Sequence, residues 1–207
     1  MGHDNQQDIQ AYIHCMEEIK RRISVVGRVL SGETNTGYVI TNAELLAVQL
    51  RKVAELIALS TICSHREEYE RIRDDFERDW KARLILRDVE RINPNFYPKP
   101  TRQVKDPETG EIVRAENVKD GYLTREELVD MVDECSAILH ATNPYHDNPA
   151  DPKEFIGRCK KWRDEILTLL NHHQVQLVDS NSQWWVLMQG KSDGRVHVAE
   201  MQEVGEP

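Results

Sequence analysis

Residues 41–63 read TNAELLAVQLRKVAELIALSTIC, and this stretch is apolar on nearly every side of a helical wheel. Thr41 and Glu44, three residues apart, match a capping box, which predicts that a helix begins at Thr41. A helix that is apolar almost all round belongs inside a protein, because a surface helix keeps one polar face. The stretch therefore predicts a helical bundle built around residues 41–63.

A polar stripe interrupts this apolar helix. Arg51 and Glu55 lie one turn apart, and Glu44 lies two turns earlier on the same face. One interpretation is an internal ion pair that fixes the register of the helix. The other is a site in which Arg51 holds an anion and Glu55 orients the guanidinium. We favour the structural interpretation and keep the functional one open.

Four further helices are predicted from apolar positions at spacings of three and four residues and from end signals. They are residues 9–30, which end before Gly32; residues 65–92, after a Ser64–Glu67 capping box; residues 124–142, after a Thr124–Glu127 capping box; and a helix that begins at Asp151, with Pro152 in its first turn.

Alternating apolar and polar residues predict strands in two places. Short runs on either side of DPETG predict a β-hairpin near 103–114, and residues 174–179, 183–189 and 195–201 predict a three-stranded antiparallel meander. The predicted fold is mainly α: a bundle of about five helices in residues 1–173, with the hairpin inserted, and a C-terminal meander in residues 174–207 that packs on the bundle.

Two adjacent tryptophans lie in the middle strand of the predicted meander. Successive side chains of a strand point to opposite faces, so Trp184 and Trp185 cannot share one face. Trp184 continues the longer apolar set, with Val186 and Met188, and we expect it to pack on the helices. Trp185 and Leu187 then face outward or into a partner, and they form the candidate interface.

Two predicted helices stop in the same way, at INPNFYPKP (residues 92–100) and at TNPYHDNPADP (residues 142–152). Proline ends a helix, which explains Asn-Pro in both places. The aromatic residues that come next are expected to cover the last turn of each helix. As an alternative, the two ends meet and form a polar pocket with the stripe of the central helix. That candidate pocket comprises Arg51, Glu55, Tyr97, Tyr145 and His146.

Composition excludes several functions. The net charge of −9 makes nucleic acid an unlikely partner, because nonspecific binding to phosphates needs a surplus of basic residues. No apolar stretch is long enough to cross a membrane, and no leader segment is apparent, so we expect a cytoplasmic protein. The four cysteines are far apart and match no metal motif, so we expect free thiols, with no metal and no cofactor.

No catalytic signature emerges from the sequence: there is no nucleophile elbow and no glycine-rich phosphate loop. We therefore expect a non-enzymatic module for protein–protein interaction or self-assembly, whose partner is another protein or a second copy in a homodimer. The alternative is an enzyme or a small-ligand-binding protein that uses the polar pocket.

Overall fold

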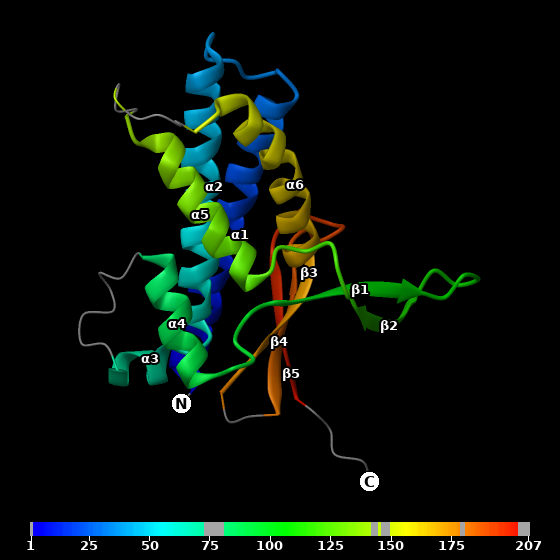
Figure 1. Cartoon of the computed structure of the whole chain (residues 1–207). Coiled ribbons are helices and arrows are strands. Elements are labelled where there is room, and N and C mark those ends of the chain that lie inside the picture. The colour runs from blue at the N-terminus through cyan, green and yellow to red at the C-terminus, as the bar shows by residue number, and fades with distance from the viewer. Residues whose placement is uncertain (1, 73–80, 142–144, 146–149, 179–180, 203–207) are drawn as a thin grey trace.

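The computed structural model describes residues 2–72, 81–141, 145, 150–178 and 181–202, and within these ranges the chain forms six helices and one five-stranded sheet (Figure 1). The helices are α1 (Gly2–Leu30), α2 (Val39–Cys63), α3 (Arg66–Ile72), α4 (Ala82–Ile92), α5 (Arg125–Leu139) and α6 (Pro152–Leu170). The strands are β1 (Lys99–Lys105), β2 (Ile112–Asn117), β3 (His172–Gln176), β4 (Ser182–Leu187) and β5 (His197–Gln202).

Helix α2 is the centre of the bundle, as its apolar sequence predicted. It contacts α1, α4, α5 and α6, and Leu46, Leu50 and Ile57 are each 0% exposed. Its predicted start is wrong, because α2 begins at Val39, with Tyr38 as the N-cap. The Thr41 hydroxyl donates to the Tyr38 carbonyl oxygen at 3.1 Å, so it bonds backwards along the helix and does not cap it.

The predicted break at Ser64 is confirmed, since α2 ends at Cys63 and Ser64 is its C-cap. The single helix predicted for residues 65–92 is wrong. Lys81 has an extended backbone (φ −78°, ψ 98°), and α4 begins after it as a separate helix. This break lets α4 run alongside α2, where Ile85 and Leu86 are fully buried, while α3 lies across the lower end of the bundle (Figure 1).

The other two helix starts are confirmed. Thr124 and Glu127 form the reciprocal bonds of a capping box, with the Glu127 amide donating to the Thr124 hydroxyl at 3.2 Å. Asp151 caps α6 by accepting from the Lys153 amide at 2.8 Å, and Pro152 occupies the first turn. Helix α5 ends at Leu139, a little before the predicted residue 142. Within the described ranges, no helix is both long and apolar enough to cross a lipid bilayer.

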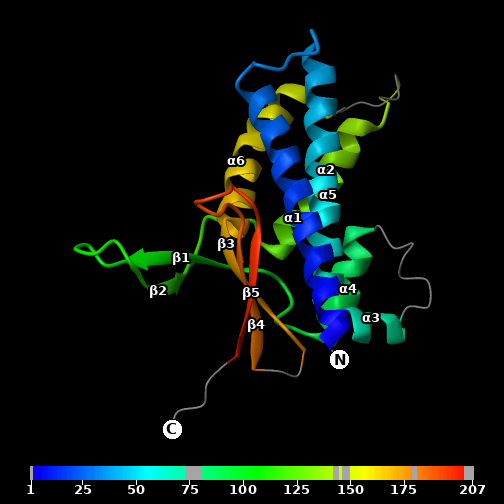
Figure 2. The ribbon, with the colours of Figure 1, turned by 180° about the vertical axis from the view of Figure 1, so that it is seen from behind.

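The strands form one antiparallel sheet in the order β2-β1-β3-β4-β5. The hairpin and the three-stranded meander are both present, but the hairpin is not a separate insertion. Strand β1 pairs with β3 through Lys99–Gln174 and Pro100–His173, which joins the two predicted units. Figure 2 shows the sheet beside the lower half of α1, with the end of α6 above it.

The inner face of the sheet is the one that Trp184 occupies. Trp184 is 1% exposed, and its ring meets the ring of Tyr12 of α1 edge-on, with 5.5 Å between the two centroids. Val175 and Val186 are buried beside it. The prediction that Trp184 packs on the helices is confirmed, and strand alternation places Trp185 and Leu187, which are half-buried, on the opposite face.

Candidate functional site

The outer face of the sheet carries a groove of about 580 Å³, here called the sheet groove. The sheet curls so that both edge strands, β2 and β5, contribute to the groove together with β4 and the start of β3. Its larger apolar side chains are Ile112, Val113, Trp185, Leu187 and Met201. The two residues of the predicted interface thus lie in one concave apolar surface with residues from the hairpin.

Several of these apolar side chains are open to solvent. Ile112 is 53% exposed, Val113 is 54% exposed and Met201 is 49% exposed. Isolated exposed apolar residues are ordinary on a protein surface, whereas a contiguous group of them marks an interaction site. Trp185, partly buried between them, is the largest side chain in the group.

The polar groups of the sheet groove are neutral or already paired. The His172 Nδ1 atom lies 2.5 Å from the Thr101 hydroxyl, and the His172 ring meets Trp185 edge-on at 5.8 Å between centroids. Burial lowers the pKa of the His172 imidazole below its ordinary value, which favours the uncharged ring. Arg114 forms an ion pair with Glu116, with 2.7 Å between nitrogen and oxygen. No acidic side chain occurs among the described residues that line the groove.

Arg51 and Glu55 form the predicted ion pair on α2. The Arg51 Nε atom lies 3.2 Å from one carboxylate oxygen of Glu55, and Lys52 Nζ lies 3.0 Å from the other. Glu55 is 8% exposed, whereas the side chains of Arg51 and Lys52 are 33% and 54% exposed. Both oxygens of the carboxylate therefore have cationic partners within the chain, and the arrangement is complete without a ligand.

The other residues of the candidate pocket lie elsewhere. The Tyr97 hydroxyl donates to the Leu123 carbonyl oxygen at 3.1 Å. Tyr145 is 91% exposed, so its predicted role in covering a helix end is wrong, whereas Phe96 at the first stop is 2% exposed. His146 lies outside the described residues. The two helices that precede these stops, α4 and α5, end at opposite ends of the bundle, so the structure does not bring the two stops together (Figure 1).

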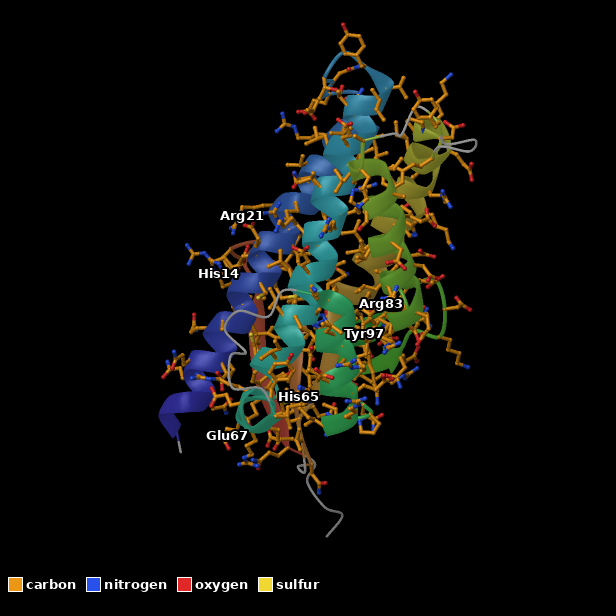
Figure 3. The ribbon with its side chains drawn as sticks, turned by 60° about the vertical axis from the view of Figure 1, so that its left-hand side comes forward. His14, Arg21, His65, Glu67, Arg83 and Tyr97 are labelled. Atoms are coloured by element: carbon orange, nitrogen blue, oxygen red, sulfur yellow. The ribbon has the colours of Figure 1, made fainter. Side chains whose placement is uncertain are left out.

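Sequence reasoning missed a set of buried polar contacts between the bundle and the sheet. The Tyr12 hydroxyl donates to His173 Nε2 at 2.6 Å, and His173 Nδ1 donates to the Leu170 carbonyl oxygen at 2.8 Å. Asn93 Nδ2 donates to His65 Nε2 at 2.8 Å and to the Gln176 carbonyl oxygen at 3.0 Å. Figure 3 labels His65, which lies near the lower end of α2.

These contacts are structural. They satisfy groups that burial would otherwise leave unpaired, and they connect segments far apart in the chain, since Tyr12 and His173 are 161 residues apart. The only local signal was Asn93 before proline, which indicated a helix end and nothing about its distant partners.

Comparison with known proteins found no matching family model, no similar curated protein and no similar solved structure. The surfaces of the molecule are therefore the guide to its function, and the sheet groove is the surface on which apolar side chains from several strands converge.

Proposed function

We propose that the protein is a non-enzymatic self-association module whose copies pair through the sheet groove. The observation that carries the proposal is the cluster of exposed apolar residues around Trp185, contributed by strands at both edges of one sheet. Tryptophan at the centre of an apolar patch is the typical anchor of a protein interface, because its large ring loses much water-exposed area on contact.

The charge of the molecule supports a second copy as the occupant. The chain has a net charge of −9, so two copies repel each other over most approaches. No acidic residue lies among the described lining of the sheet groove, and its arginine is paired with Glu116. Two copies that meet through this groove thus bring together apolar surfaces whose described lining has no acidic side chain, in a two-fold arrangement that uses the same patch twice.

Sedimentation velocity over a concentration series tests this proposal. The wild-type protein should sediment at twice the monomer mass of 24.1 kDa, and Val113→Glu should shift the protein toward the monomer by burying a charge in the contact. Val48→Glu is the matched control, because Val48 is 40% exposed on α2, outside the sheet groove. A wild-type monomer at every concentration would contradict the proposal, and so would equal dissociation of both variants.

The small-ligand alternative, built on Arg51, Glu55, Tyr97, Tyr145 and His146, is not proposed. Glu55 already contacts two cations, and Tyr145 is 91% exposed. The described members of this set therefore do not surround a common cavity in the way that a ligand site requires.

A further inference from the structure

A second groove lies between α1 and α6, away from the sheet groove. It has a volume of about 640 Å³, which is within the range of small-molecule sites. Figures 1 and 2 show α1 and α6 as neighbours, with the β4–β5 turn beside the lower end of α6. This space, here called the α1–α6 groove, shares no lining residue with the sheet groove, so a ligand bound in it would be independent of the proposed self-association.

One end of the α1–α6 groove is apolar. It is formed by Ile19 and Ile23 of α1, Ile166 and Leu170 of α6, and Met188 at the end of β4. All five side chains are mostly buried by the rest of the protein and belong to the lining of this groove. Lys20 also lies here, but its ammonium group donates to the Gly194 carbonyl oxygen at 2.6 Å and pairs with Glu17 at 3.1 Å.

The other end is basic. Arg28, Lys160 and Arg163 line it, and Glu33 is the acidic residue in the described lining. Glu33 forms an ion pair with Arg28, with 3.0 Å between Arg28 Nε and a Glu33 carboxylate oxygen. Lys160 forms no ion pair with any residue in the described ranges. This end of the groove therefore has a net positive charge, although the net charge of the whole chain is −9.

Arg163 lies across the groove on Gly27. A Cβ atom placed on Gly27 would lie 3.6 Å from Arg163 Nε, an ordinary van der Waals distance, so the guanidinium lies close to the backbone of α1. One Arg163 nitrogen pairs with Asp164 at 3.2 Å, but the Arg163 Nε–H is buried and has no hydrogen-bond partner among the described residues. The Arg163 side chain as a whole is 34% exposed and lines the groove, so its guanidinium group remains accessible to an anion there.

We propose that the α1–α6 groove binds a small amphiphilic anion, a linear aliphatic carboxylate. Its head group accepts hydrogen bonds from Arg163 and Lys160, and its hydrocarbon chain lies on the apolar end between Ile23 and Met188. From Gly27 to Ile19 the groove follows α1 for about 12 Å, at about 1.5 Å per residue, which is suited to a chain of medium length. Burial of that chain and the charge-assisted bonds to the head group both stabilise the complex.

A titration with decanoate, below its micelle-forming concentration, tests the proposal on the full-length protein. The NMR signals of the Gly27 amide and the Met188 methyl group should shift together and saturate, because these residues mark the two ends of the groove. Arg163→Gln should weaken binding by about tenfold or more through loss of charge-assisted hydrogen bonds. Arg158→Gln is the matched control: it removes the same charge from the same helix outside the groove and should leave the affinity unchanged.

Two further probes separate the head group from the chain. Decyltrimethylammonium has the same chain with a cationic head and should not bind, because the basic end repels it. Ser24→Trp should block decanoate without removing a charge, since Ser24 lines the groove from an exposed position on α1. The proposal is overturned if decanoate causes no saturable shift at Gly27 and Met188, if Arg163→Gln binds as well as the wild type, or if the cationic amphiphile binds equally tightly.

Discussion

Acidification should destabilise this protein through one buried side chain, His173. The imidazole is 0% exposed; it donates to the Leu170 carbonyl oxygen and accepts from the Tyr12 hydroxyl, so it is held in its neutral form. Burial lowers the pKa of His173 from 6.5 to about 4. The unfolded chain therefore takes up a proton as the pH falls below 6.5, whereas the folded protein does not until about pH 4. At about 1.4 kcal/mol per pH unit, this difference removes about 3 kcal/mol of stability.

Urea unfolding at pH 7.5 and pH 4 measures this loss. The stability contribution of His173 is fully present above pH 6.5 and is lost progressively between pH 6.5 and about 4. Burial also lowers the pKa of His65 and His172, so the wild-type protein should lose more unfolding free energy than the contribution of His173 alone. His173→Gln should lose about 3 kcal/mol less than the wild type over this interval. His14→Gln, at an exposed position on α1 labelled in Figure 3, is the control and should follow the wild type. If His173→Gln had the same pH dependence as the wild type, the reasoning would be refuted.

Three substitutions test the packing, and thermal melts with urea titrations measure each of them. Trp184→Ala should cost about 3–5 kcal/mol of unfolding free energy, because its ring fills the contact with Tyr12; a loss below about 1 kcal/mol would show that the inner face is misassigned. Thr124→Ala should cost about 1 kcal/mol by removing the cap of α5, and an unchanged stability would argue against that cap. Arg51→Met should cost less than about 1 kcal/mol, because Arg51 is partly exposed and Lys52 still neutralises Glu55; a loss of several kcal/mol would indicate a buried, uncompensated carboxylate.

The helices were predictable where local chemistry decides their ends. The hydrogen-bonding groups of each cap, Thr124 with Glu127 and Asp151 with the Lys153 amide, lie within a few residues of each other, so the sequence pattern and the structure agree. The same pattern at Thr41 and Glu44 failed, because a hydroxyl within the first turn has a competing acceptor in the Tyr38 carbonyl oxygen. The break before α4 at Lys81 carries no glycine or proline signal, and α4 packs against α2 after it, a long-range contact that local sequence patterns do not contain.

The sheet and the candidate sites depended on contacts that local patterns do not contain. Alternation predicted that Trp184 packs on the helices, but nothing local indicated that β1 pairs with β3 through Lys99 and Gln174. That pairing places Val113 of the hairpin in the same groove as Trp185, and so it enlarges the predicted interface. The shared Asn-Pro pattern left open, as an alternative, that Tyr97 and Tyr145 line one pocket, but the helices before them end at opposite ends of the bundle. A repeated end signal specifies the end of a helix, whereas its position depends on tertiary packing.

The most direct measurement of self-association through the sheet groove is an isotope-filtered NMR experiment on a mixture of labelled and unlabelled protein, which detects only contacts between different copies. We expect such contacts from the ring of Trp185 and from the methyl groups of Leu187 and Val113, all of which line the sheet groove. This mode of pairing would be contradicted by contacts between copies that involve other surfaces and none of these three residues. It would also be contradicted if no contact between copies were detected at concentrations well above those used for sedimentation.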